Sequence, residues 1–299
     1  MGGARTPRCS IVLPSLNEGA MLSMTVDSIA GADTDCSYEI LIVDDGSTDG
    51  STAPFRRRSN RRVRLVPGGG LGVARARNLG AEHARGEYLI FMDAHCRVSP
   101  GWLDLFVDVF TDPTVGMAGP SFTKLESPTP RGCGMYWADY TLDPCWFEPP
   151  EPSNRYYAPL TTGACQVFRR RTFLELGAYE AGFTRWGFED VEMCLRTWLL
   201  GYRVAVEPAV TIAHYFREAR DNYAVNDEEV TYNFFRMLYL HFSPTRMRAV
   251  REAIAGNPHV SAAQERLADS DVFERRDAML ASRRYDDDWF FAEVNGPPA

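Results

Sequence analysis

The sequence has 299 residues and a formal net charge of −8, and 45% of its residues are apolar, 12% aromatic and 24% charged. This composition is typical of a globular protein and excludes long disordered regions, and the length suits one large α/β domain, alone or with an appendage. The acidic balance argues against a nucleic-acid partner, because nucleic-acid readers carry basic surfaces. No apolar run approaches the ~20 residues that would cross a bilayer, so we expect no transmembrane segment.

Cysteine and lysine usage bears on compartment and origin. The seven cysteines form an odd set without C-x-x-C pairs, which favours a reduced, cytoplasmic protein. The first eight residues lack the apolar core of a signal peptide. Lys124 is the only lysine, and this bias toward arginine indicates GC-rich coding, so we expect a bacterial host.

The N-terminal half alternates apolar runs with segments of helical spacing. Continuous apolar runs are typical of strands buried on both faces of a parallel sheet, and apolar residues three or four positions apart indicate the helices between them. The predicted strands are 9–14, 38–43, 63–66 and 88–92, and the predicted helices are 20–30, 73–84 and 102–110. This order indicates a Rossmann-like α/β fold, a mainly parallel sheet with helices on both faces.

A glycine-rich stretch, residues 68–72, lies between the third predicted strand and its helix. It resembles a phosphate cradle, but it lacks both the G-x-G-x-x-G register after a first strand and the P-loop lysine, so we reject dinucleotide and P-loop sites. Arg75 and Arg77 follow on the helix; each either reaches a phosphate or lies exposed on the surface, as charged residues usually do.

The predicted strand 88–92 is followed by Asp93 and His95, an acid and an imidazole two positions apart. Ligands of parallel sheets collect at the carboxyl ends of strands. Residues i and i+2 point the same way, so the pair offers two ligands for a divalent metal. Such a short motif has weak specificity by itself.

The second half begins with a poorly periodic, aromatic and proline-rich segment, 121–160. It predicts either a binding loop or lid, or an excursion that packs its aromatic rings on the domain. The elements predicted after it are a strand at 161–168, helices at 171–176 and 191–200, strands at 202–206 and 210–217, a helical extension from 221 onward and a solvated tail at 285–289. By themselves, the acids Glu189 and Asp190 suit a helix start, and His214 suits a buried core position.

Four segments resemble, in order, the motifs of nucleotide-sugar glycosyltransferases of the GT-A fold, in particular family 2. They are 11–18 for the opening strand with P-x-x-N-E, 42–49 for V-D-D-G-S-x-D, 76–80 for A-R-N-x-G and 91–95 in the place of D-x-D. The D-x-H variant is similar to that of the polypeptide N-acetylgalactosaminyltransferases. Their D-x-H-C, W-G-G-E-N and G-H-V-F-R correspond to residues 93–96, 186–190 and 213–217.

The resemblance implies that His214 joins Asp93 and His95 as the third ligand of Mn²⁺ (or Mg²⁺), a mixed oxygen and nitrogen set that suits manganese better than calcium. It also implies a UDP-sugar donor, with Asp45 reading uracil. The implied nucleotide-binding residues are Pro14, Ser15, Glu18, Asp45, Arg77, Asp93, Ala94 and Arg217, and the implied sugar and acceptor residues are Gly163, Ala164, Trp186 and Glu189.

The sequence departs from this family at two places. Asp190 stands where the peptide-modifying enzymes have asparagine, and it matches the aspartate that acts as general base in inverting family-2 enzymes. We therefore expect inversion. Ala164 and Phe188 stand where those enzymes have glycine, so the sugar pocket is expected to be smaller and to suit a plain UDP-hexose.

Together these features predict a catalytic domain over 8–219, with a nucleotide-binding half (8–119) and a sugar and acceptor half (120–219), and a helical extension over 220–299. The expected reaction moves a hexose or N-acetylhexosamine from a UDP-sugar to a hydroxyl or thiol of a peptide or small natural product. A saccharide or lipid-linked carrier is an alternative acceptor. Two alternatives belong to other functional classes. A nucleotidyltransferase would need a basic grip on a triphosphate, which the single lysine disfavours. A non-catalytic nucleotide-sugar-binding protein would not need Asp190, so the presence of this residue disfavours it.

Overall fold

The computed structural model describes residues 6–57, 62–147, 154–217 and 226–296. Within these residues one large mixed sheet runs in the order β10-β12-β6-β11-β4-β1-β2-β3, with β5 paired to β12 and β7 to β6. Its strands are β1 (Cys9–Ser15), β2 (Tyr38–Asp44), β3 (Val63–Pro67), β4 (Tyr88–Met92), β5 (Cys96–Val98), β6 (Val115–Lys124), β7 (Ser127–Gly132), β10 (Tyr156–Tyr157), β11 (Cys165–Arg169) and β12 (Arg203–His214).

The N-terminal half has the predicted alternation. β1 pairs in parallel with both β2 and β4, and β2 pairs in parallel with β3. The helices between them are α1 (Ala20–Gly31), α2 (Ala53–Arg57), α3 (Val73–His83) and, after β5, α4 (Trp102–Val109). Every residue of β1, β2 and β4 is buried, as the continuous apolar runs required. The predicted Rossmann-like α/β class is confirmed.

The second half of the sheet differs in detail from the prediction. The two strands expected at 202–206 and 210–217 form one long strand, β12, with an irregular register between Glu207 and Thr211. Pro208 lies within this irregular stretch. Proline lacks the backbone N–H that a regular ladder requires, which accounts for the irregularity. β11 is shorter than expected and runs antiparallel between β4 and β6. Residues 161–164 therefore form a turn before β11, next to the carboxyl end of β4.

The aromatic segment 121–160 partly packs on the domain and partly lines a cavity. It holds β7, β10 and the small hairpin of β8 (Met135–Trp137) and β9 (Pro144–Trp146). Trp137 is buried against Phe290 and Phe291, which fits packing on the domain. Trp146 lines a cavity, which fits a binding segment. Residues 148–153 lie outside the described part of the chain.

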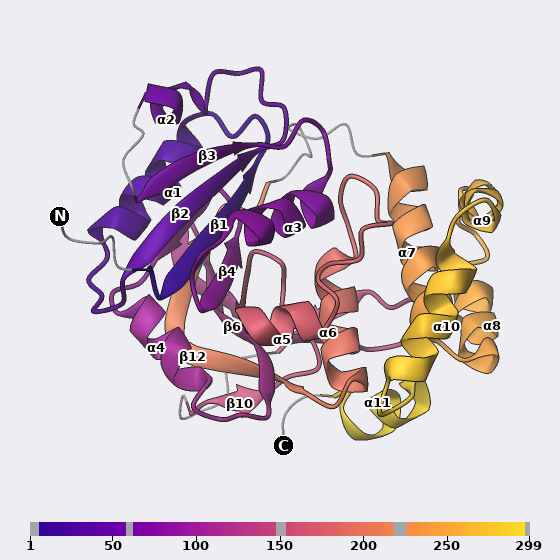
Figure 1. Cartoon of the computed structure of the whole chain (residues 1–299). Coiled ribbons are helices and arrows are strands. Elements are labelled where there is room, and N and C mark those ends of the chain that lie inside the picture. Colours follow the sequence, from indigo (N-terminus) through magenta and orange to yellow (C-terminus); the bar gives the residue numbers. More distant parts are fainter. Residues whose placement is uncertain (1–5, 58–61, 148–153, 218–225, 297–299) are drawn as a thin grey trace.

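Two hydrophobic cores lie on opposite faces of the sheet. One contains the buried faces of α1 and α4. The other is built by α3, α5 (Arg170–Glu175) and α6 (Glu189–Leu199) together with the C-terminal helices. Figure 1 shows those helices gathered beside α6, on the side away from β3. They are α7 (Asp227–His241), α8 (Pro244–Ala253), α9 (Val260–Ala268), α10 (Val272–Ser282) and α11 (Asp287–Glu293).

The helical character of the C-terminal extension is as predicted, but the expectation of a solvated tail at 285–289 is wrong at its centre. Asp287 is buried and accepts hydrogen bonds from the Ser243 backbone N–H (2.9 Å) and the Arg246 side chain (3.1 Å). Asp287, within this run of acids, therefore joins the start of α11 to the start of α8. In the described residues no helix has the length and apolar character that a bilayer crossing needs.

Candidate active site

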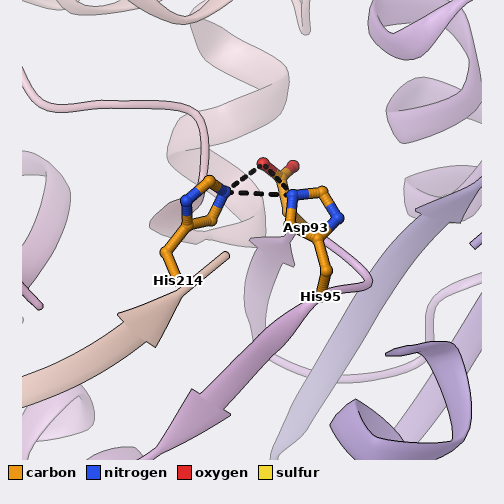
Figure 2. Close-up of side chains that lie close together, drawn as sticks. All are labelled: Asp93, His95 and His214. Atoms are coloured by element: carbon orange, nitrogen blue, oxygen red, sulfur yellow. Dashed lines mark hydrogen bonds and ion pairs between the residues drawn. The ribbon is translucent and has the colours of Figure 1, made fainter. Parts of the chain in front are cut away.

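Three side chains from two strand ends converge on one point (Figure 2). The Nε2 atoms of His95 and His214 are 3.1 Å apart. The Asp93 Oδ2 atom lies 3.3 Å from the His214 Nε2 atom and 3.8 Å from the His95 Nε2 atom. Ligands that sit about 2.1 Å from a metal at right angles to one another are about 3 Å apart. The three donor atoms therefore fit a single divalent ion.

The sheet topology brings these ligands together. Asp93 follows β4, and its backbone N–H donates to the Ala164 carbonyl (3.1 Å). His95 stands just before β5, and β5 pairs with the end of β12 so that His214 lies opposite Cys96. The metal set predicted from D-x-H and the distant histidine is thus assembled by strand pairing.

The hydrogen bonds around the triad leave the ligand atoms ready for a cation. Glu18 is buried and accepts a hydrogen bond from the His95 Nδ1 atom (3.0 Å), so His95 Nε2 carries the lone pair that faces the site. Burial lowers the pKa of His214 and favours its neutral form. Burial alone would raise the pKa of Asp93, but the neighbouring His214, His95 and Arg77 hold it below its usual value.

Arg77 lies under the site and not on the surface, so the surface interpretation is wrong for it, although Arg75 is exposed. The buried Arg77 guanidinium donates to Glu189 (3.0 Å), to Asp93 (3.3 Å) and to the Gly163 carbonyl (2.8 Å). It holds the turn that precedes β11, the start of α6 and one metal ligand in a fixed arrangement.

Glu189 and Asp190 open α6 beside the triad. Burial raises the pKa of Glu189 to about 7, with Arg77 opposing the shift and Asp190 adding to it. Burial also raises the pKa of Asp190, although its carboxylate accepts the backbone N–H groups of Gly163 (2.7 Å) and Val191 (2.8 Å). Raised pKa values make these two neighbouring carboxyls better proton acceptors than ordinary exposed carboxylates.

These groups line a cavity of about 700 Å³. The predicted site residues in its wall are Pro14, Glu18, Arg77, Asp93, Ala94, His95, Gly163, Ala164, Trp186, Glu189, Asp190, His214 and Arg217. The structure does not place Ser15 or Asp45 in the wall. Ser15 is buried at the end of β1, and its hydroxyl has no partner among the described residues.

Asp45 is engaged by the glycine-rich stretch. Its carboxylate accepts the backbone N–H groups of Gly70 (2.9 Å), Leu71 (2.6 Å) and Gly72 (2.8 Å). Successive N–H groups of this kind form an anion-binding concavity. The resemblance of 68–72 to a phosphate cradle therefore has a physical basis, but the anion in it is a side chain of the protein itself.

Several wall residues carried no motif. They include Val73, Met135, Asp143, Pro144, Trp146, Thr162 and Val230. Val230 belongs to α7, so the predicted C-terminal extension contributes to the cavity. Trp146 was within the aromatic segment that composition singled out, whereas nothing in the local sequence marks Val230 as a wall residue.

The segment before α6 has an unusual backbone. Gly187 (φ 108°) allows a left-handed conformation, but the non-glycine residues Arg185 (φ 28°) and Phe188 (φ 70°) also have positive φ. Such conformations cost about 1–3 kcal/mol each and cluster at functional sites. Phe188 packs against Phe234 of α7, with ring centroids 5.2 Å apart.

Known glycosyltransferases resemble this chain in sequence. The family model "Glycosyl transferase family 2" matches residues 10–177, and the model "N-terminal domain of galactosyltransferase" matches 147–220. Polypeptide N-acetylgalactosaminyltransferase 11 of Xenopus tropicalis is 29% identical over 238 residues, which are 72% of this chain and 39% of that protein. Polypeptide N-acetylgalactosaminyltransferase 12 of Mus musculus is 27% identical over 265 residues, which are 80% of this chain and 46% of that protein.

The expected resemblance to these transferases is confirmed, but this chain spans less than half the length of either relative. Both relatives are animal proteins and lend no support to the expected bacterial origin.

Solved structures share the fold. The crystal structure of GalNAc-T7 with UDP, GalNAc and Mn²⁺ superimposes with a TM-score of 0.77 at 20% identity, covering 97% of this chain and 57% of that one. The mannosyltransferase PcManGT from Pyrobaculum calidifontis, in complex with GDP-Man and Mn²⁺, gives a TM-score of 0.52 at 19% identity, covering 97% and 77%. The predicted GT-A fold is confirmed.

Proposed function

The chain belongs to glycosyl transferase family 2, and we propose that it transfers a hexose or N-acetylhexosamine from a UDP-sugar to an acceptor hydroxyl or thiol, with Mn²⁺ (or Mg²⁺) bound by Asp93, His95 and His214. The observation that carries this proposal is the convergence of the three ligands in the wall of the 700 Å³ cavity. The metal and nucleotide in the two similar structures support it.

The reaction leaves a nucleoside diphosphate with an added negative charge. A divalent ion at the triad supplies Lewis-acid stabilisation of that charge. Arg217 extends from the end of β12 beside Glu18, where its guanidinium lies 2.5 Å from the Glu18 carboxylate, and in our proposal it contacts the diphosphate. Arg77 holds Asp93 from below through its ion pair. Pro14, Ser15, Ala94 and Asp45 are proposed to frame the uridine.

Asp190 is proposed as the general base of an inverting reaction. The backbone N–H groups of Gly163 and Val191 fix its carboxylate, and its raised pKa favours uptake of the acceptor's proton. The acceptor oxygen would attack the anomeric carbon as the bond from that carbon to the phosphate breaks. A product that keeps the anomeric configuration of the donor contradicts this assignment.

We propose a plain UDP-hexose as the preferred donor. Ala164 is buried in the cavity wall and Phe188 brings an aromatic ring to it, which reduces the room for an N-acetyl group. Gly163 and Glu189 complete this end of the cavity, and the half-exposed Trp186 offers a flat surface for sugar or acceptor.

The proposed acceptor is a peptide or a small natural product, with a saccharide or lipid-linked carrier as the second candidate. The names of the relatives support the peptide. The proposed compartment is the cytoplasm, which the seven unpaired cysteines support.

The proposal is tested by measuring the release of UDP from a panel of UDP-sugars with and without Mn²⁺. We expect Mn²⁺-dependent release that His214→Ala abolishes, while His83→Ala, which changes an exposed histidine of α3, keeps it. Calorimetry that detects no UDP binding in the presence of Mn²⁺ would overturn the proposal. Release of pyrophosphate from nucleoside triphosphates would instead indicate a nucleotidyltransferase.

A further inference from the structure

The turn formed by residues 184–188 connects two parts of the site. It carries Trp186 and Phe188 into the cavity wall and leads directly into Glu189 and Asp190. Its positive φ values at Arg185, Gly187 and Phe188 are conformations that persist only when neighbouring groups over-determine them. Groups from α7 and from the glycine-rich stretch hold the turn in place.

One buried side chain of α7 makes five hydrogen bonds to this turn. The Asn233 Oδ1 atom accepts from the backbone N–H (2.8 Å) and the hydroxyl (3.1 Å) of Thr184. The Asn233 Nδ2 atom donates to the carbonyls of Thr184 (2.8 Å), Trp186 (3.1 Å) and Gly187 (3.1 Å). Asn233 is 0% exposed, so these bonds form where water does not compete.

Other contacts place the turn between α7 and the glycine-rich stretch. Arg185 pairs with Glu229 of α7 (3.3 Å). On the opposite side the Arg185 carbonyl accepts the Val73 backbone N–H (2.7 Å). A Cβ atom on Gly72 would lie 2.8 Å from the Arg185 Cα atom, so only glycine permits this approach. The turn has little room to move on either side.

The bonds continue from the turn to the carboxyls. The Gly187 backbone N–H donates to Glu189 (3.0 Å), and Glu189 pairs with Arg77 (3.0 Å), which also contacts Asp93. The amide of Asn233 thus fixes one end of a chain of contacts whose other end is a metal ligand. Asn233 itself is not in the cavity wall, so it does not contact the reactants directly.

We propose that Asn233 is a positioning residue for the transfer step, which fixes the turn 184–188 and with it Asp190 and Trp186. This inference rests on the proposed function. A displacement of about 1 Å in a catalytic group can reduce a rate about 100-fold. Asn233 bonds directly to the turn, whereas it reaches Asp93 only through Glu189 and Arg77, so we expect loss of Asn233 to slow turnover much more than it weakens UDP binding.

The experiment compares Asn233→Ala and the isosteric Asn233→Asp with the wild-type chain. The aspartate keeps an acceptor for Thr184 but loses the donor to three carbonyls. The matched control is Asn295→Ala, because Asn295 also links distant segments through two bonds to the Trp137 backbone (2.9 and 2.8 Å) and is not in the cavity wall. The measurements are melting temperature, UDP affinity with Mn²⁺ by calorimetry, and kcat and KM for hydrolysis of UDP-glucose and UDP-N-acetylgalactosamine.

We expect kcat to fall about 100-fold in both Asn233 variants, with UDP affinity within about twofold of wild type, and Asn295→Ala to keep the wild-type kcat. Unchanged kcat in the Asn233 variants, an equal loss in Asn295→Ala, or a loss of UDP affinity that matches the loss of kcat would each overturn the inference. If Asn233→Ala does not fold, Asn233→Asp decides. A wild-type chain that neither binds UDP nor hydrolyses either donor rejects the proposed function instead.

Discussion

The Nη1 atom of Arg77 lies 3.0 Å from the Oε1 atom of Glu189, although 112 residues separate them in the chain. Both side chains are buried, and the same guanidinium contacts Asp93 and the Gly163 carbonyl. The first helix after the glycine-rich stretch is therefore joined to the acidic start of α6 through one cation. The pair places one buried positive and one buried negative charge in the cavity wall.

We expect Arg77→Met to destabilise the protein by about 3–5 kcal/mol at pH 8, because it leaves the buried Glu189 carboxylate without its cation. The loss should be smaller at pH 5.5, where Glu189 can hold a proton. Urea unfolding at both pH values measures the difference. Arg75→Ala is the control on the same helix, since Arg75 is exposed, and it should change stability by less than about 0.5 kcal/mol. Equal losses in the two variants contradict the assigned role of the pair.

The raised pKa of Glu189 predicts that the free energy of unfolding depends on pH. Its pKa in the folded protein is raised to about 7, above its ordinary value of 4.5, so the folded state binds the proton more tightly than the unfolded state. The stabilisation is complete below pH 4.5 and is lost as the pH rises through 7. Relative to Glu189→Gln, the wild type should lose on the order of 3 kcal/mol between pH 4.5 and pH 8. Denaturant unfolding of both proteins across this range checks the sign; a difference that grows in favour of the wild type refutes it.

Glu18 should control metal affinity without being a ligand. It orients His95 through the Nδ1 atom, and removal of such a partner typically weakens metal binding 10–100-fold. We expect Glu18→Ala to reduce Mn²⁺ affinity by about this factor, as measured by calorimetry. Glu82→Ala, at an exposed position of α3, provides the control and should bind Mn²⁺ as the wild type does. Wild-type affinity in Glu18→Ala would show that the hydrogen bond does not support the metal site.

Phe188 should limit the size of the donor sugar. Phe188→Gly suits the positive φ of this position and removes the ring from the cavity wall. We expect the ratio of kcat/KM for UDP-N-acetylglucosamine over UDP-glucose to rise about 10-fold or more, a range typical of a changed group in a specificity pocket. Phe188→Leu keeps most of the bulk and should keep the wild-type ratio. If this kcat/KM ratio stays constant in Phe188→Gly, the selectivity for the donor sugar depends on another wall residue.

The sequence was sufficient for the fold class and for the grouping of Asp93, His95 and His214. Continuous apolar runs predicted the buried strands, and the D-x-H motif and the distant His214 were matched through the family resemblance. The triad's meeting point depends on β5 pairing with the end of β12. Short-range periodicity carries no information about such pairing, so the resemblance had to supply it.

Long-range hydrogen bonds account for what sequence patterns missed. Asn233 lies among the apolar residues of α7 and has no motif, yet it meets a turn 46 to 49 residues earlier. Asp287 lies in a run of acids that suggested solvent, yet a helix start more than forty residues away buries it. Composition describes a residue's local neighbours, whereas these positions are determined by partners in other elements. The division into a catalytic domain and an extension stays a prediction.

The carboxylate of Asp45 neutralises the concave run of amides at residues 70–72. Free orthophosphate therefore finds these amide N–H groups already paired with a carboxylate of the protein. If Asp45 reads uracil as proposed, the ring shares the carboxylate with those amides, so base recognition and the hydrogen bonds of the loop compete for one acceptor. Amide hydrogen exchange at residues 70–72 would then respond to the binding of UDP.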